Sequence, residues 1–173
     1  IVKPEVGGQG ILLRKIDSEE EFLHYHTKMP YEYIVQQMVN YPMEVSVFYI
    51  RHPQNKTGIV TGFLHKIPLC VIGDGLQTLE QLINANVKAK KRIDELYNKH
   101  QAKWDAVLPN GEKYMLSYAA NHNRGALFID LKNEIDEKLV AVFDKISLQV
   151  NDFFYGRYDI ICSNVEDLKM GKN

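Results

Sequence analysis

The chain has 173 residues, of which 45% are hydrophobic and 25% are charged, and its formal net charge is −1. This composition is close to that of soluble globular domains and is sufficient for a buried core. The near-neutral charge gives no indication of a nucleic-acid partner or an acidic membrane surface, and no apolar run approaches the roughly 18 residues that span a bilayer.

The cysteines indicate the redox compartment of the chain, and the N-terminus indicates whether it is a fragment. Cys70 and Cys162 are far apart in apolar runs, which favours two buried free thiols in a reducing compartment over a disulfide or a metal pair. The sequence lacks an initiator Met and starts within an apolar run. We therefore expect a fragment or a trimmed domain, and a cytoplasmic location.

The first half of the chain is predicted to be rich in strands. Residues 1–2 and 10–13 are predicted as strands joined by a glycine loop. Ser18 and Glu21 form a capping-box pattern, which predicts a short helix. Further strands are predicted in residues 33–39, 44–51 and 59–67, as a meander, and in residues 69–72, before a tight glycine turn.

The second half of the chain is predicted to contain the longer helices. Thr78 and Gln81 form a second capping box, and helical spacing of apolar residues predicts helices over residues 87–104 and 135–150. Strands are predicted within residues 108–119, 121–131 and 153–163, before a polar tail. Strands followed by long helices indicate the α+β class.

Three stretches could carry chemistry, and each has a simpler structural explanation. Around "KPEVGGQG", a lysine and backbone N–H groups could hold phosphate oxygens, or the stretch could be a glycine-rich hairpin. In "VQQMVNYPMEV", a strand end could pair with an adenine edge and a glutamate could bind ribose, or both could face solvent.

The third stretch is "GRYDI", in which strand alternation places Arg157 and Asp159 on one face and Tyr158 and Ile160 on the other. The arginine and the aspartate could form a structural ion pair. The alternative is a phosphate-binding arginine and a metal-ligating aspartate. Three further charged or titratable residues lie on predicted strands, namely Arg51, His65 and Lys66. The default interpretation is that each is a surface charge, and the alternative is a role in a ligand cleft.

Taken in order, these stretches resemble the ATP-grasp superfamily, in particular the carboxylate–amine ligases related to D-alanine–D-alanine ligase and cyanophycin-synthetase-type enzymes. The resemblance rests on "IVKPEVGGQGILL", "YIVQQMVNYPMEVSV", "VIGDGLQTLEQLI" and "YGRYDI" with "EDLKMG". It implies an ATP-grasp fold with mostly antiparallel sheets and flanking helices, truncated at both ends. Residues 1–50 would form the small subdomain, and residues 51–173 an incomplete large C-terminal subdomain.

The resemblance also implies roles for individual residues. The phosphates would be held by Lys3 and by a loop of Gly7, Gly8 and Gly10. The adenine would be bound by Gln36 and by the backbones of Gln37 and Val39, and the ribose by Glu44. Arg157 would stabilise charge on the transferred phosphoryl group, and Asp159 would ligate Mg²⁺. The family's Glu-x-Asn strand, which completes its metal site, does not occur in this sequence.

The implied function is the ATP-binding core of a ligase that forms an acyl phosphate from a small carboxylate and joins it to an amine or similar nucleophile. We expect this chain to be inactive or nearly so alone. We also expect it either to self-associate, as a homo-oligomer, or to be only marginally stable, because unpaired strand edges and apolar patches invite association. Two alternatives are a degenerate, non-catalytic ATP-grasp domain that binds a nucleotide or a partner, and an unrelated α+β domain with a glycine hairpin.

Overall fold

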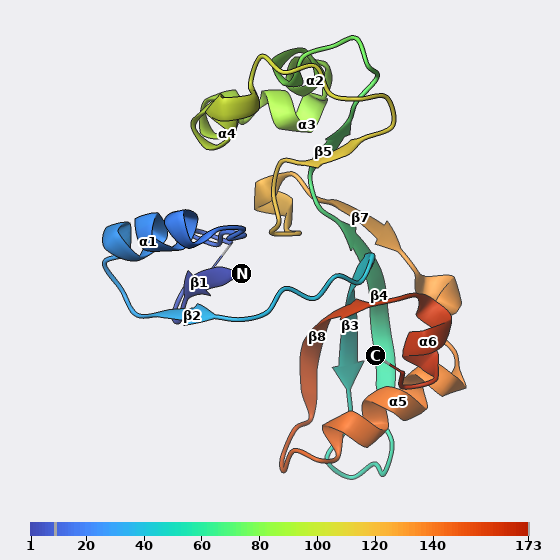
Figure 1. Cartoon of the computed structure of the whole chain (residues 1–173). Coiled ribbons are helices and arrows are strands. Elements are labelled where there is room, and N and C mark those ends of the chain that lie inside the picture. The colour runs from blue at the N-terminus through green and yellow to red at the C-terminus, as the bar shows by residue number, and fades with distance from the viewer. Residues whose placement is uncertain (9, 173) are drawn as a thin grey trace. The chain divides into compact units, whose positions relative to one another are not determined.

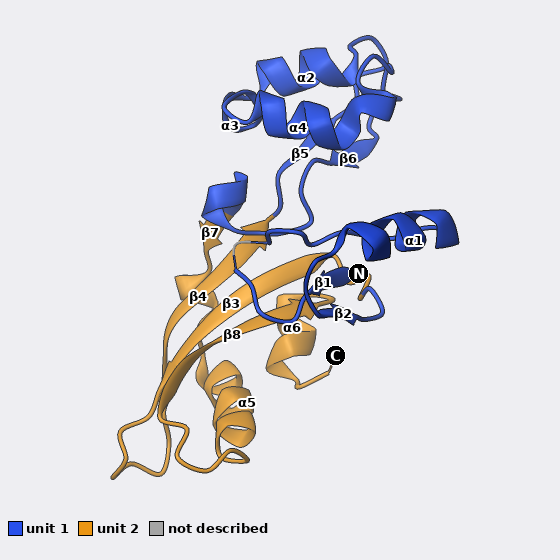
Figure 2. Ribbon diagram, turned by 90° about the vertical axis from the view of Figure 1, so that its left-hand side faces the viewer, with its two compact units in different colours: residues 1–38, 68–127 blue, residues 39–67, 128–173 orange. Residues whose placement is uncertain are grey.

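The computed structural model describes residues 1–8 and 10–172, and the chain divides into two compact units (Figures 1 and 2). Unit 1 consists of Ile1–Met38 and Pro68–Leu127, and unit 2 consists of Val39–Ile67 and Phe128–Asn173. Each unit therefore combines two separate segments of the chain. The subdomain boundary predicted after residue 50 falls within unit 2, and that functional division stays a prediction.

The N-terminal segment of unit 1 pairs two short strands around a helix. Strand β1 (Val2–Pro4) is antiparallel to β2 (Tyr33–Val35), and α1 (Glu19–Lys28) lies between them in sequence. Ser18 caps α1 by accepting the N–H of Glu21, as predicted. The Glu21 carboxylate accepts from the N–H of Asp17 rather than that of Ser18, so the capping box is only half formed.

Two strand predictions in this segment are wrong. Residues 10–13 form turns because Gly10 and Leu12 have φ angles of 67° and 60°, which are incompatible with a strand. A single bridge between Val2 and Arg14 remains. The strand predicted over residues 33–39 ends at Val35 and pairs with β1, so it is not part of a meander.

The second segment of unit 1 is a two-stranded sheet with three helices. Strand β5 (Cys70–Ile72) is antiparallel to β6 (Lys113–Met115), and the helices are α2 (Leu79–Ala85), α3 (Val87–Lys90) and α4 (Ile93–His100). The Thr78–Gln81 capping box is confirmed on both sides. The helix predicted over residues 87–104 is instead split after Lys90 and gives way to a 3₁₀ turn, Gln101–Lys103. A second 3₁₀ turn is formed by His122–Arg124.

Unit 2 is built on a four-stranded sheet in the order β7-β4-β3-β8 (Figure 2). Strand β3 (Met43–Ile50) is antiparallel to both β4 (Ile59–Ile67) and β8 (Tyr155–Cys162), and β7 (Leu127–Asp130) lies beside β4. Helices α5 (Glu137–Ser147) and α6 (Val165–Lys169) cover one face, and a 3₁₀ turn, Lys132–Glu134, precedes α5. The polar tail predicted after the last strand is in fact α6, which Asn164 caps.

The predicted class, α+β with mostly antiparallel sheets and flanking helices, is confirmed. Both cysteines are free, with Cys162 buried and Cys70 half-buried. Among the described residues, no helix is long and apolar enough to cross a membrane.

A buried tyrosine joins the sheet of unit 2 to α5. The Tyr49 hydroxyl donates to Asp144 Oδ1 over 2.5 Å, and the N–H of Gly58 donates to the same oxygen over 2.7 Å. Burial, and then the hydrogen bond to Asp144, raise the pKa of Tyr49 to about 12. A Cβ at Gly58 would lie 2.4 Å from the Tyr49 ring, so this position requires glycine.

We therefore predict that Gly58→Ala lowers the free energy of unfolding by about 1–3 kcal/mol, because the ring or the backbone must shift to accept the methyl group. Urea denaturation measures this change. Gly8→Ala is the control, since a Cβ at Gly8 meets no atom within 4 Å. An equal loss of stability in both variants would show that contact with Tyr49 is not the cause.

Candidate functional site

The sheet of unit 2 has an apolar face covered by α5 and α6 and an opposite, open face that carries polar as well as apolar side chains. On β3, Val45 and Val47 are fully buried in the core beneath these helices. On β8, Tyr158 and Ile160 pack against the same core, whereas Arg157 and Asp159 are exposed. The alternation predicted for "GRYDI" is therefore confirmed.

Strand register brings five polar residues together on this open face. Ser46 on β3 is opposite Asp159 on β8, and Glu44 on β3 is opposite Lys66 on β4. Arg157 follows on β8, two residues before Asp159. We call Glu44, Ser46, Lys66, Arg157 and Asp159 the open-face cluster.

Lys66 is the central cation of the open-face cluster. Its Nζ atom lies 2.6 Å from Glu44 Oε1 and 3.2 Å from Asp159 Oδ1, and its side chain is only 8% exposed. A nearly buried ammonium needs such partners, because an unpaired charge there would carry a large desolvation cost. Lys66 therefore links the two carboxylates across three strands.

Asp159 has three hydrogen-bonding or ionic partners. Arg157 Nη2 lies 2.8 Å from Asp159 Oδ2, and Ser46 Oγ donates to Oδ1, which also faces Lys66. Partial burial alone would raise the pKa of Asp159, but the hydrogen bond from Ser46, the charge and hydrogen bond of Lys66 and the hydrogen bond from Arg157 together lower it below the usual value of 3.8. Asp159 is therefore held as a carboxylate at neutral pH.

The geometry bears on both interpretations of "GRYDI". The Arg157–Asp159 ion pair exists, but the Arg157 side chain is 55% exposed. A guanidinium carries five N–H donors, so a pair made through one nitrogen leaves others directed to solvent. Arg157 can therefore bind an anion such as a phosphate without first leaving a buried position.

The cluster fits Mg²⁺ only in a restricted way. Among the described residues, no group of three or more His, Cys, Asp or Glu side chains could hold a metal ion. Asp159 Oδ1 already accepts from Ser46 and Lys66, which leaves lone-pair capacity mainly on Oδ2. Mg²⁺ in nucleotide sites takes one or two carboxylates besides phosphate oxygens, so Asp159 could supply one ligand to an ion that phosphates also hold.

The phosphate-binding residues predicted in unit 1 surround the end of β1. Lys3 is half-buried on β1, opposite Ile34. Gly7 and Gly8 are exposed, and the N–H of Ile11 donates to the Gly8 carbonyl over 3.2 Å. Gln9 lies outside the described residues. Gly7 and Gly8 are therefore accessible, and their role in phosphate binding stays a prediction.

The predicted adenine-binding residues lie after β2, in an irregular and exposed stretch. The N–H of Gln36 donates to the Ile1 carbonyl over 3.0 Å. In the part of the chain that the structure describes, the backbone groups of Gln37 and Val39 make no hydrogen bond. These groups have the capacity to pair with a base edge, and that function stays a prediction.

The structure thus gathers Glu44, Arg157 and Asp159 on one sheet face and adds Lys66 and Ser46, to which we assigned no definite role from the sequence. Arg51 has a different environment, since its guanidinium donates to the carbonyls of Asn55 and Phe153 over 3.3 Å and stacks on the Phe154 ring. Arg51 therefore stabilises the end of the sheet. The alternation of strand residues could have indicated Lys66, but the connection between β3 and β4, residues 51–58, does not fix its register with β3.

No family model matches the chain. The chain is 28% identical over 130 residues to the glutathione biosynthesis bifunctional protein GshAB of Clostridium perfringens, with 66% of this chain and 17% of that protein covered. A crystal structure of a bifunctional glutathione synthetase from Pasteurella multocida aligns with 95% of this chain and 24% of that chain, at 17% identity and a TM-score of 0.43.

The chain therefore spans less than a quarter of the length of either protein. The sequence similarity relates the chain, at low identity, to carboxylate–amine ligases of the ATP-grasp type. This is the relationship that the ordered motifs predicted.

We predict that Lys66→Met destabilises the chain by about 1–3 kcal/mol at neutral pH, because two carboxylates lose the cation between them. The depressed pKa of Asp159 contributes stability above the usual Asp pKa, and this contribution is lost as pH falls through the lowered value. The difference in the free energy of unfolding between the variant and the unmodified chain should therefore become smaller below about pH 4. Urea denaturation at neutral and acidic pH measures it.

The control is Lys145→Met, which removes an exposed lysine from α5. It should change stability by less than about 0.5 kcal/mol. A loss of stability in Lys66→Met that does not depend on pH would contradict the electrostatic explanation.

Proposed function

We propose that the chain is the ATP-binding core of an ATP-grasp ligase that activates a carboxylate as an acyl phosphate and joins it to an amine or similar nucleophile. The observation that carries this proposal is the open-face cluster, in which Arg157, Asp159 and Glu44 come together from two different strands. The sequence relationship to ATP-grasp ligases supports the same assignment.

The proposed reaction has two transfers. A carboxylate oxygen attacks the γ-phosphorus of ATP, and ADP leaves. The nucleophile then attacks the acyl carbon, and inorganic phosphate leaves as the new bond forms. The first transfer moves a phosphoryl group, for which catalysis is mainly positioning and stabilisation of negative charge.

The residues of the cluster have distinct proposed roles. Arg157, exposed and cationic, would stabilise charge on the transferred phosphoryl group. Glu44 would accept hydrogen bonds from ribose hydroxyls, and Asp159 would hold Mg²⁺, which neutralises phosphate charge when bound. Lys66 would keep both carboxylates in position, because it contacts each of them.

The residues before and after β2 complete the proposal from the sequence. Lys3 and the glycines Gly7, Gly8 and Gly10 would contact the phosphates. Gln36 and the backbones of Gln37 and Val39 would bind the adenine. These assignments rest on the resemblance of the motifs and on the accessibility of the residues.

One observation favours a second candidate, a non-catalytic ATP-grasp domain that binds a nucleotide. Both oxygens of Asp159 already have partners, and the described residues hold no group of three metal-ligating side chains. A site with so little metal-binding capacity could bind a nucleotide without transferring its phosphoryl group. The response of ATP affinity to Mg²⁺ and assays of ADP formation distinguish the two candidates.

We predict that Arg157→Gln weakens ATP binding about tenfold, because a charge-assisted hydrogen bond to phosphate is lost. The melting temperature should change little, since an exposed ion pair contributes little stability. Calorimetric titration and thermal denaturation of the same variant measure the two effects. The control is Lys145→Gln on α5, which changes the net charge equally and should affect neither quantity.

A fall in melting temperature with unchanged ATP affinity would show that Arg157 is only a structural partner of Asp159. The same result would remove the main support for the proposed function, because Arg157 is its most exposed cation.

We further predict that the chain binds ATP weakly and that Mg²⁺ raises the affinity by less than about tenfold, because Asp159 can offer only one ligand position. Titrations with ATP in the presence and absence of Mg²⁺ measure this ratio. Tight binding that strictly requires Mg²⁺ would contradict the prediction and would indicate a more complete metal site.

A further inference from the structure

Unit 1 contains a large pocket with an excess of positive charge. Its volume is about 1240 Å³, and it is lined by residues from 10–29 and from 98–119, all within unit 1. The charged lining residues are six cations and three carboxylates, namely Arg14, Lys15, Lys28, Lys99, Lys103, Lys113, Asp17, Glu20 and Glu21. A concave surface of one predominant charge concentrates ligands of the opposite charge.

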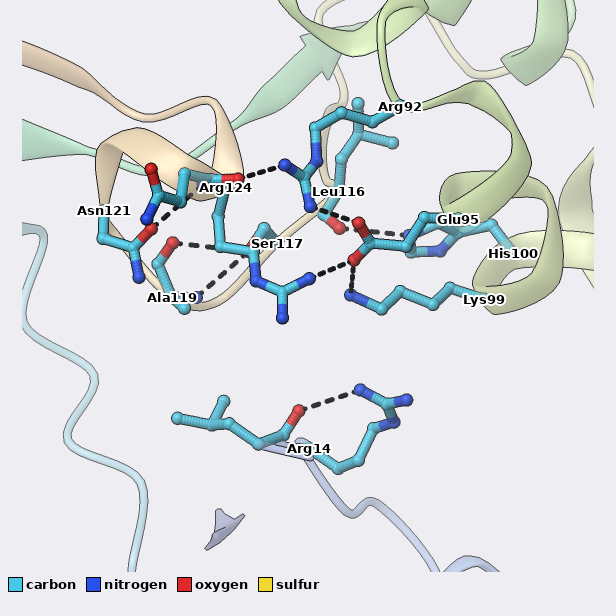
Figure 3. A network of polar contacts seen from close by, with 12 residues as sticks. Arg14, Arg92, Glu95, Lys99, His100, Leu116, Ser117, Ala119, Asn121 and Arg124 are labelled. Atoms are coloured by element: carbon cyan, nitrogen blue, oxygen red, sulfur yellow. Dashed lines mark hydrogen bonds and ion pairs between the residues drawn. The ribbon is translucent and has the colours of Figure 1, made fainter. Parts of the chain in front are cut away.

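The basic side of this pocket joins an ion-pair network on α4. The carboxylate of Glu95 pairs with Arg92, Arg124 and Lys99, with a distance of 2.8 Å to Lys99 Nζ (Figure 3). Three cations thus share one carboxylate, which leaves a local excess of positive charge. We call Arg92, Glu95, Lys99 and Arg124 the Glu95 network.

The electrostatics of Lys99 reflect this excess. Burial lowers the pKa of Lys99, the hydrogen bond and charge of Glu95 raise it, and the charges of Arg14 and Arg124 lower it again. The net shift is downward, although Lys99 has a carboxylate partner. An additional anion near Lys99 would therefore stabilise its charged form.

Arg14 is a pocket cation without a carboxylate partner among the described residues. Its Nη1 atom donates to the Leu13 carbonyl over 3.0 Å, and Figure 3 shows it separate from the Glu95 network. The backbone of Arg14 is fixed by its bridge to Val2, with N–H···O distances of 2.9 and 3.0 Å. Most of its five N–H donors are thus available for a ligand.

We propose that this pocket binds a small molecule carrying two or more carboxylates, with Arg14 and Lys99 as its principal charged contacts. A carboxylate suits this environment, because the Glu95 network already holds a carboxylate among Arg and Lys side chains in the same manner. The hydroxyl group of Tyr118, which also lines the pocket, can donate to a further oxygen.

The inference deepens the proposed function by naming a substrate class, and in that respect it rests on the proposed ligase activity. The binding itself depends only on unit 1, whereas the open-face cluster lies in unit 2. Gly10, which lines the pocket, also belongs to the loop proposed to contact the ATP phosphates. The two proposals are therefore separated by Arg157→Gln in unit 2, which should weaken ATP binding and leave carboxylate binding unchanged.

Calorimetric titration of the full chain with citrate at low ionic strength tests the proposal. We expect saturable binding, weakened about tenfold by Arg14→Gln because a charge-assisted contact is lost. The matched control is Lys90→Gln, which removes the same charge from an exposed position on α3 outside the pocket and should change the affinity less than about twofold. Lys99→Gln is a second variant and should also weaken citrate binding.

Two further titrations decide the chemistry of the ligand. Inorganic phosphate should bind more weakly than citrate, and Arg157→Gln in unit 2 should leave the citrate affinity unchanged. The proposal would be overturned if the unmodified chain showed no saturable citrate binding. It would also be overturned if Arg14→Gln and Lys90→Gln lost citrate affinity equally, or if phosphate bound more tightly than citrate. Loss of ATP binding by the unmodified chain together with retained citrate binding would instead count against the proposed function alone.

Discussion

The arrangement of the open face of unit 2 depends on one lysine between two carboxylates. Lys66 is almost buried and contacts Glu44 and Asp159, which come from the two other strands of the cluster. Without this cation, two negative charges on neighbouring strands would repel each other on a partly dehydrated surface. The lysine thus compensates the charges of both acidic groups, to which the proposed function assigns ribose and metal binding.

The charged networks of the two units differ in the balance between cations and carboxylates. On the open face of unit 2, Lys66 and Arg157 face Glu44 and Asp159, so the charges cancel. An anion that binds Arg157 must compete there with Asp159. In unit 1, the cations around Glu95 outnumber the carboxylate, and Arg14 adds another positive charge. The first arrangement favours selective binding at a modest affinity, and the second favours capture of anions.

Local signals in the sequence predicted the elements that depend on local interactions. The Thr78 cap, the Ser18 cap and the alternation in "GRYDI" were found as expected, because hydrogen bonds within four residues and strand periodicity determine them. The extent of several elements could not be predicted in this way. Residues 10–13 turn because Gly10 and Leu12 adopt positive φ angles, which a Leu-rich sequence does not indicate.

The site was predictable only in part for a similar reason. Glu44, Arg157 and Asp159 were selected because each matched a motif, but their meeting on one face depends on the pairing of β3 with β8, more than 100 residues apart. Lys66 joins them through the pairing of β3 with β4, across a connection whose length does not fix a register. Partners that only long-range register creates are absent from any local sequence pattern.

The ion pair between Arg157 and Asp159 does not argue against a functional site, although both explanations were open from the sequence. A phosphate-binding arginine and a metal-binding aspartate must lie close together, because both address the same phosphate group. In the absence of a ligand, two such opposite charges at this separation will pair, so the ion pair is expected under either explanation. What distinguishes them is exposure. A purely structural pair gains by excluding water, whereas the Arg157 and Asp159 side chains are 55% and 40% exposed. That exposure gives the pair little value for stability and leaves it accessible to a ligand.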